Sequence, residues 1–415
     1  MTTASLAPHV GPGDFNQLPL SERDIRWRLV REAMAERGID CLLIAGNSAR
    51  WNDMNANIRY VANYADPLSA ECYALFPLEG DGMLITQMEP KRSAHALSWF
   101  ADVRGLNMRD LAAPDMTAMA AGRIAALGLE AGTLGLVGNV LLEGVNIGMP
   151  WNRLEAMKAR LPRMRFVDVT DMFFELRSVK TGAEIECLAR SAELVDIGFE
   201  AHLRISRVGI SERELHAGIV HAMECAGAEP PTILLLQTGP MPHSTLTQDP
   251  IPSGRKLGPG DVIISESSPK WAGYQAQGLQ CIVLGDATRE MRELAKHGAE
   301  AWHICADKVR PGNTPDQVAH AADRIIERAR EHLGGLADGL RPICVGAGLG
   351  ALDPHHAHRE IVPGQAFMLE IGPGGRPFKP PQHVNGGVLV VSTAGDPRCF
   401  IGSHPMEERF LVELR

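Results

Sequence analysis

The sequence predicts an α/β protein built from two domains, and three observations support this fold class. The first is length, because 415 residues exceed the roughly 100 to 200 residues of one domain. The second is composition, since 45% hydrophobic and 22% charged residues are typical of chains that bury a large core. The third is the alternation of short apolar runs with helical patterns along the chain. These observations exclude a single small module and a globally disordered chain.

The first domain is predicted over residues 21–171, after a Pro- and Gly-rich extension that covers residues 1–20. Apolar residues at helical spacing after Ser21 predict a helix that ends at Gly38. A short apolar run predicts a buried strand at 39–44, and further strands are predicted at 74–76, 83–85, 134–137 and 166–169. This alternation is typical of an α/β domain.

The second domain is predicted over residues 172–415 and opens with a long helix, whose apolar stripe includes Ile185, Leu188 and Val195. The next helix is predicted from Ser211 to position 226, because Glu214 completes a capping box. Further helices are predicted at 288–309 and 314–332, and strands at 232–236, 261–264, 281–284, 366–370 and 388–391.

Charge and cysteine content exclude several functional classes. Lys and Arg number 41 against 50 Asp and Glu, a formal charge of −9 that is the wrong sign for a general nucleic-acid or anionic-membrane binder. The eight cysteines show no CxxC pair and predict buried free thiols. A secretory signal and an 18-residue apolar stretch are both absent from the sequence. We therefore expect a cytoplasmic protein that binds neither nucleic acid nor membranes.

Polar side chains gather at strand ends or between Gly/Pro turns, where strand geometry can direct them into a cleft. The stretches that hold them are 260–277, 345–359, 367–370 and 383–385. In the first of these, Trp271 and Tyr274 are expected to pack the hairpin. The glycines at 346–351 superficially suggest a phosphate-binding loop, but the G-x-G-x-x-A pattern follows only a weak strand signal. A dinucleotide site is therefore not expected.

Around these stretches the sequence resembles the pita-bread family of aminopeptidase P, prolidase, methionine aminopeptidase and creatinase. Residues 28–44 resemble the opening of the creatinase-like N-terminal domain, and 175–184 resemble the entry to the catalytic domain. The strand that begins at Gly260-Asp261 and the strand that ends at Glu370 follow in the family's order. The resemblance covers nearly the whole chain. It implies a creatinase-like N-terminal α/β domain, then a pita-bread catalytic domain, in a homodimer.

The resemblance also bears on metal binding, because five side chains hold two metal ions in the metallopeptidase members. The matching positions in this chain are Glu266, Gln277, Ala347, Glu370 and Asn385. Only two of these residues are carboxylates, whereas a dinuclear site needs several carboxylates and an imidazole. The resemblance therefore implies that the metal site has been lost and that no cofactor is used.

A single zinc ion is the alternative to a metal-free site. The cluster His355, His356 and His358 could supply ligands together with Glu370 or His383. Adjacent imidazoles cannot all converge on one ion, so the metal-free interpretation is favoured.

The family has a metal-free branch, since creatinase hydrolyses a carbon-nitrogen bond without metal and ectoine hydrolase resembles it. His355, Arg359 and Glu360 form a His-x-x-x-Arg-Glu pattern that also occurs in creatinase-like sequences, and Glu370 fits a glutamate that creatinase retains. Two departures make creatine a poor substrate candidate. A carboxylate of creatinase falls on Leu279, and one of its histidines falls near Gln248, with His243 as the nearest imidazole.

The retained residues suit acid/base hydrolysis of a carbon-nitrogen bond. Glu266 and Glu370 on adjacent strands of one cleft would repel, so one of them should hold a proton at neutral pH. The ionised glutamate can activate water or attack an sp2 carbon, while its partner or His243 protonates the leaving nitrogen. The expected substrate is a small carboxylate-bearing amidine, cyclic amidine or amide.

The remaining candidates are expected to bind that substrate. Arg359 would hold its carboxylate, and Gln277 and Asn385 would donate neutral hydrogen bonds. His355 and His383 complete the candidate set.

Three alternatives stay open. The first is an Xaa-Pro peptidase-like metallohydrolase, or a lyase acting on a small zwitterion, with an altered metal site. The second is a non-catalytic binding protein. The third is a structural role for the candidate residues, such as Glu266 as a solvated strand end and Glu370 as the cap of the following turn.

Overall fold

The computed structural model describes residues 15–49, 53–64, 66–106, 115–141, 144–146, 148–240, 250–353, 355–372, 386–402 and 404–415. The chain divides into two compact units, Met1–Arg177 and Ser178–Arg415. The division falls a few residues after position 172, because helix α6 (Thr170–Ser178) packs with the first unit. Phe173 of this helix meets Tyr60 edge to face at 6.0 Å, and Arg177 donates a 2.6 Å hydrogen bond to Asn57.

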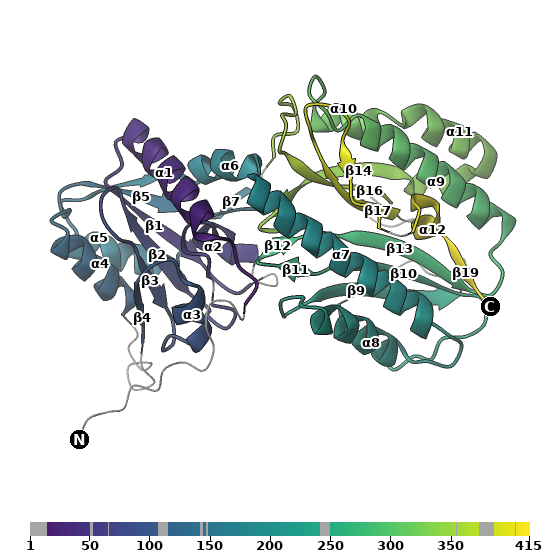
Figure 1. Ribbon diagram of the computed structural model, residues 1–415, viewed down its shortest axis with the longest axis horizontal. Helices are drawn as coiled ribbons and strands as arrows, with labels where there is room; N and C mark the ends of the chain where they lie inside the picture. The colour runs from purple at the N-terminus through teal and green to yellow at the C-terminus, as the bar shows by residue number, and fades with distance from the viewer. Residues whose placement is uncertain are drawn as a thin grey trace. The chain divides into compact units, whose positions relative to one another are not determined.

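The first unit is built on a six-stranded mixed sheet in the order β4-β3-β2-β1-β5-β8 (Figure 1). Its strands are β1 (Cys41–Gly46), β2 (Cys72–Pro77), β3 (Met83–Thr86), β4 (Asp102–Gly105), β5 (Thr133–Val137) and β8 (Arg165–Asp168). A small hairpin adds β6 (Asn139–Leu141) and β7 (Gly144–Asn146). The helical elements are α1 (Leu20–Arg37), the 3-10 turn η2 (Asp53–Asn55), α2 (Ala56–Ala62), α3 (Arg92–Leu97), α4 (Met116–Ala126) and α5 (Trp151–Arg160).

The predicted elements of this unit are confirmed. Strand β1 is buried along its whole length because it lies between antiparallel β2 and parallel β5 in the centre of the sheet. Helix α1 ends where predicted, since Gly38 adopts the left-handed conformation with φ 63° that closes a helix C-terminus.

The second unit is built on a nine-stranded sheet whose main path runs β15-β14-β16-β17-β13-β10-β9, with β18 beside β17 and β19 beside β13. The strands are β9 (Ile233–Pro240), β10 (Asp261–Ser268), β13 (Gly278–Leu284), β14 (Arg341–Gly348), β15 (Gly350–Asp353), β16 (Ala366–Gly372), β17 (Gly386–Val391), β18 (Arg398–Cys399) and β19 (Val412–Leu414). Short strands β11 (Lys270–Trp271) and β12 (Tyr274–Gln275) form the tip of the predicted 260–277 hairpin. The strand predictions for this unit are confirmed.

The helices of the second unit are α7 (Gly182–Ile205), α8 (Glu212–Cys225), α9 (Arg289–Asp307), α10 (Pro315–His320), α11 (Asp323–Leu333), the 3-10 turn η4 (Gly334–Gly339) and α12 (Met406–Phe410). Helix α8 begins with the predicted capping box of Ser211 and Glu214. The expectation of one helix over 314–332 is wrong. The chain turns at positions 321–322 so that α10 can pack on β14 while α11 packs on α9.

The long helices cover one face of this sheet. Gly278 lies against α7, where a Cβ would meet Val195 at 2.2 Å, and Leu369 belongs to the core cluster beneath α9. Paired residues on neighbouring antiparallel strands project to the same face. Register therefore places Gly278, Val388 and Leu369 on this covered face and their sequence neighbours on the opposite one.

Most predicted buried thiols are confirmed, with two exceptions. Cys225 is exposed in the last turn of α8, and Cys399 is only partly buried in the short strand β18. Burial raises the pKa of the Cys41 and Cys281 thiols to about 12, so neither is a nucleophile at neutral pH. No helix in the described part of the chain is both long enough and apolar enough to cross a membrane.

Candidate functional site

The two candidate glutamates lie in one row on the face of the sheet opposite to Gly278 and Leu369. Glu266 of β10 pairs with Leu279 of β13, and Leu279 pairs with Gly387 of β17. Gly387 pairs in turn with Glu370 of β16. Because paired residues project to the same side, the fold brings together two carboxyl groups that are 104 positions apart in sequence (370 − 266). The expectation that they lie on adjacent strands is wrong, because β13 and β17 lie between β10 and β16.

Glu266 is held by two hydrogen-bond donors. Ser268 donates its hydroxyl to Glu266 Oε1 at 3.0 Å, and Gln277 donates its amide Nε2 to the same oxygen at 2.8 Å. Burial raises the pKa of Glu266, although these two hydrogen bonds oppose the rise. Donors favour the ionised form of an acid, so Glu266 is the better placed of the two glutamates to carry the negative charge.

Glu370 has a different environment. Burial, followed by the nearby charge of Glu266, raises the pKa of Glu370 from 4.5 to about 8. Both effects favour the protonated acid, and no hydrogen bond that would favour the carboxylate contributes to this shift. Of the two glutamates, Glu370 therefore has the environment that more strongly favours the protonated acid.

Gly387 gives Glu370 its space. A Cβ at Gly387 would lie 2.5 Å from the Leu369 carbonyl oxygen and 3.1 Å from Glu370 Cγ. Any larger residue would therefore displace the glutamate. In this row Gly387 adjoins Glu370 without a side chain, and Leu279 stands between Gly387 and Glu266.

A buried polar network supports β10 from the covered face. His202 of α7 is fully buried, and its two ring nitrogens each lie 2.9 Å from a hydroxyl oxygen, those of Ser206 and Ser265. Gln280 also donates to Ser265 at 2.8 Å. Burial lowers the pKa of His202 to about 4, so the ring is neutral. The network fixes the strand residue that precedes Glu266.

Gln277 has one satisfied and one unsatisfied amide group. The residue is only 7% exposed, its Nε2 is used by Glu266, and its backbone N–H points to Met368 Sδ at 3.3 Å. Its Oε1 is buried and has no hydrogen-bond partner among the described residues. Its amide donor is directed to Glu266, and the predicted role of Gln277 in substrate binding stays a prediction.

The imidazole-rich segment lies beyond β15. His355 accepts a 3.1 Å hydrogen bond from the Gly346 N–H through Nδ1, its ring meets Phe367 edge to face, and burial lowers its pKa. Arg359 is exposed on the following turn, and the next residue, Glu360, accepts from the Gly312 N–H at 2.8 Å. This turn is therefore attached to the loop before α10. The substrate-binding roles of His355 and Arg359 stay predictions.

Three candidates, His243, His383 and Asn385, lie outside the described residues. The packing prediction for the hairpin is confirmed. Tyr274 is fully buried and donates a 2.5 Å hydrogen bond to Glu184, while Trp271 packs on the core beneath α7 and α8.

Sequence reasoning missed Ser268, Met368 and Gly387. The short spacing of Ser268 from Glu266 was a usable signal, because alternate strand residues share a face. No local pattern indicates that Gly387 adjoins Glu370, since strand pairing decides it.

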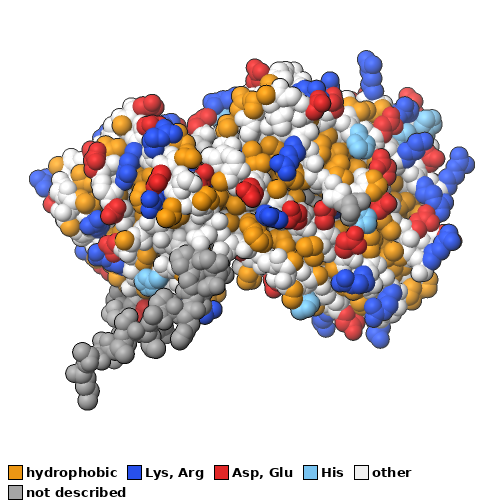
Figure 2. Space-filling model, in the orientation of Figure 1, with side chains coloured by type: hydrophobic (Ala, Val, Ile, Leu, Met, Phe, Trp, Pro, Cys, Tyr) orange, Lys and Arg blue, Asp and Glu red, His pale blue; other side chains and the backbone are white. Residues whose placement is uncertain are grey.

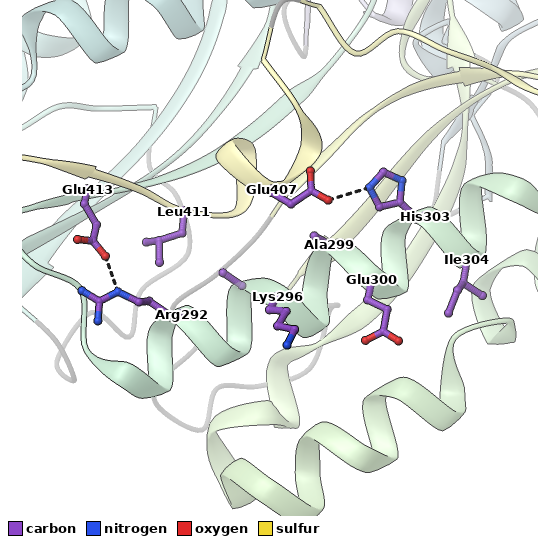
Figure 3. Close-up of a pocket in the computed structure, with 10 residues that line it drawn as sticks. Arg292, Lys296, Ala299, Glu300, His303, Ile304, Glu407, Leu411 and Glu413 are labelled. Carbon is purple, nitrogen blue, oxygen red and sulfur yellow. Dashed lines mark hydrogen bonds and ion pairs between the residues drawn. The ribbon is translucent and has the colours of Figure 1, made fainter.

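A separate hollow of about 710 Å³ lies between α9 and the C-terminal segment (Figure 3). The Arg292–Glu413 ion pair at 2.6 Å and a hydrogen bond between His303 and Glu407 at 3.2 Å join its two walls. Neither candidate glutamate lines it. On the molecular face drawn in Figure 2, acidic and basic side chains are intermixed.

Two family models match the chain. "Creatinase/Prolidase N-terminal domain" matches residues 26–179, and "Metallopeptidase family M24" matches residues 186–391. A curated relative is the Xaa-Pro dipeptidase of Pyrococcus furiosus, 24% identical over 185 residues, which are 44% of this chain and 52% of the relative. The matched part thus spans about half the length of that relative.

Solved structures share the fold over nearly the full chain. The X-Pro aminopeptidase from Thermotoga maritima superposes with a TM-score of 0.71 at 18% identity, covering 93% of this chain and 99% of that one. The N-terminal domain of FACT complex subunit SPT16 from Cicer arietinum gives 0.67 at 14% identity, covering 96% and 100%.

The described donor set does not fit the dinuclear centre that the family name implies. The described residues contain no group of three or more His, Cys, Asp or Glu that could hold a metal ion. At two of the positions that the resemblance gives to metal ligands, Gln277 supplies an amide and Ala347 a methyl group. Two carboxyl groups and one amide cannot neutralise two dications.

Proposed function

Because the chain belongs to the creatinase/aminopeptidase P/prolidase family, we propose that it is a hydrolase that cuts a carbon-nitrogen bond without a bound metal. The proposed substrate is a small amidine, cyclic amidine or amide that bears a carboxylate. The observation that carries the proposal is the row that places Glu266 and Glu370 on one face of the sheet, with an amide at Gln277 in place of a further acid.

The two acids take complementary roles. Glu266, hydrogen-bonded by Ser268 and Gln277, is the ionised base or nucleophile. Glu370, whose pKa is raised to about 8, is the proton donor. Catalysis by a positioned acid and base is most efficient when the pKa of each lies near the working pH, and this pair meets that condition for the acid.

The hydrolytic step balances with water as the only co-reactant. Water gives a proton to Glu266, and its oxygen forms a bond to the sp2 carbon of the substrate. The carbon-nitrogen bond then breaks, and the nitrogen leaves with the proton from Glu370. Transfer of the proton from Glu266 back to Glu370 through solvent or product restores the starting state.

A second candidate is hydrolysis of Xaa-Pro dipeptides, because three curated relatives at 23 to 24% identity are named Xaa-Pro dipeptidases. The Xaa-Pro candidate agrees with the first proposal that the reaction is a hydrolysis, and it differs from that proposal in the substrate. The homodimer and the cytoplasmic location, like the roles of His243, His383 and Asn385, stay predictions.

The test is a hydrolysis screen of the purified protein against carboxylate-bearing amidines, cyclic amidines, ureas, N-acyl amino acids and Xaa-Pro dipeptides. We expect turnover that survives chelation and falls by at least about 100-fold in Glu266→Gln and Glu370→Gln, in line with the loss of an acid or base catalyst. The control is Glu331→Gln, at an exposed position on α11. Activity that requires added metal would refute the metal-free mechanism, and retained activity in both glutamate variants would refute the site.

A further inference from the structure

The unsatisfied carbonyl oxygen of Gln277 is an acceptor without a donor. It is buried, on a residue that is 7% exposed, and no described residue donates to it. A buried polar group without a partner is costly, and such groups in native proteins often mark a ligand. The question is which ligand atom this oxygen accepts from.

The described neighbours of Gln277 limit which groups can donate a hydrogen bond to its Oε1. Glu266 and Met368 both act as acceptors toward it, one from the side-chain amide and one from the backbone N–H. Ser268, the nearby hydroxyl donor, is used by Glu266. Because the described residues supply no further donor to this oxygen, we assign the donor to a molecule bound at the carboxyl site.

The side chain is also fixed in place. Its amide is held at 2.8 Å by Glu266 and its backbone by Met368, so Oε1 cannot turn away without breaking the hydrogen bond to Glu266, the proposed base. A fixed acceptor discriminates more sharply than a mobile one, because a ligand without the matching donor leaves it unpaired.

We propose that Gln277 is a specificity-determining residue that accepts a hydrogen bond from an N–H at the carbon-nitrogen bond to be cut. This inference rests on the proposed function and deepens it. The substrate class becomes primary or secondary amides and amidines whose scissile nitrogen carries hydrogen. An Xaa-Pro bond is disfavoured, because its nitrogen has no hydrogen to donate.

Two other glutamines show why position matters. Gln275 and Gln280 also have a buried Oε1 without a described partner. Gln280, however, projects to the covered face, where it donates to Ser265, so no substrate reaches it. Gln280→Met is therefore a matched control for Gln277→Met, since both remove one buried amide from the same hairpin.

The experiment compares two pairs of probes that differ only in an N-methyl group. Binding of N-acetylglycine and N-acetylsarcosine is measured by calorimetry, and hydrolysis of glycylglycine and glycylsarcosine by amine release. For the wild type we expect the N–H member to be favoured about 10- to 100-fold. Gln277→Met should reduce this preference to less than about threefold, whereas Gln280→Met should lower thermal stability and keep the preference.

The outcomes separate this inference from the proposed function. Equal binding of both members of a pair, absence of binding by either N-acyl probe, or efficient cleavage of Gly-Pro by the wild type would overturn the role of Gln277. Each of those results leaves the proposed hydrolase intact if the wider screen finds turnover that depends on Glu266 and Glu370. An unchanged preference in Gln277→Met would likewise overturn it.

Discussion

The protonated Glu370 should make the stability of the second unit depend on pH in a direction unusual for a carboxyl group. Below pH 4.5 this side chain is protonated in both the folded and the unfolded chain. Between pH 4.5 and about 8 the unfolded chain releases the proton while the folded chain retains it. The free energy of unfolding therefore falls as pH rises through this window, and the loss is complete above about pH 8.

The size of the effect follows from the shift. A rise of the pKa from 4.5 to about 8 corresponds to at most about 5 kcal/mol, at roughly 1.4 kcal/mol per pKa unit. Because Glu370 keeps some exposed surface, solvent reduces this value, and we expect about 2 to 3 kcal/mol. Glu370→Gln keeps the shape of the side chain and removes the titration. The variant should therefore gain about that much stability over the wild type between pH 5 and pH 9.

Urea denaturation at pH 5, 7 and 9 measures this difference for the wild type, Glu370→Gln and the exposed control Glu331→Gln. The control should follow the wild type at each pH. A constant difference between Glu370→Gln and the wild type from pH 5 to pH 9 would show that Glu370 titrates normally. In that case the raised pKa, and with it the acid role of Glu370, would have to be abandoned.

Three further outcomes are expected. Gly387→Ala should reduce turnover by at least about tenfold, because the alanine Cβ would lie 2.5 Å from the Leu369 carbonyl oxygen and displace Glu370. Unchanged kinetics would show that the space above Gly387 is unimportant. Lys180→Met should lower the free energy of unfolding by about 3 to 5 kcal/mol, because it leaves buried Asp353 without the 2.7 Å ion pair. The double variant Lys180→Met with Asp353→Leu should recover part of that loss. A double variant no more stable than Lys180→Met alone would contradict this account. Dialysis against a chelator should leave thermal stability and turnover unchanged, and metal analysis at a stoichiometric level would contradict the metal-free site.

The fold class and most elements could be predicted because their signals are local. Capping residues such as Ser211, the glycine at position 38 and short apolar runs determine where helices begin, where they end and which strands are buried. The helix expected over 314–332 failed for the opposite reason. Its break depends on packing of α10 and α11 on different partners, which no local pattern encodes.

The candidate site was predicted in part. Glu266, Gln277 and Glu370 were identified from residue type and family resemblance, and the structure brings all three to one face. Their roles were not separable from the sequence. The distinction between base and acid rests on the donors around Glu266, which the hairpin supplies, and on the charge that Glu370 meets across two strands.

By itself the sequence determined that this chain is a two-domain α/β protein with carboxyl groups at the ends of buried strands. Helix caps, strand alternation and turn residues act over a few sequence positions, so their effect on secondary structure can be predicted from the sequence. Only the tertiary structure decided that Glu370 stands beside a glycine, faces Glu266 and shares a face with an unsatisfied amide oxygen. Strand register and burial set those relations, because electrostatic coupling and hydrogen bonding depend on distance in space and not on separation along the chain.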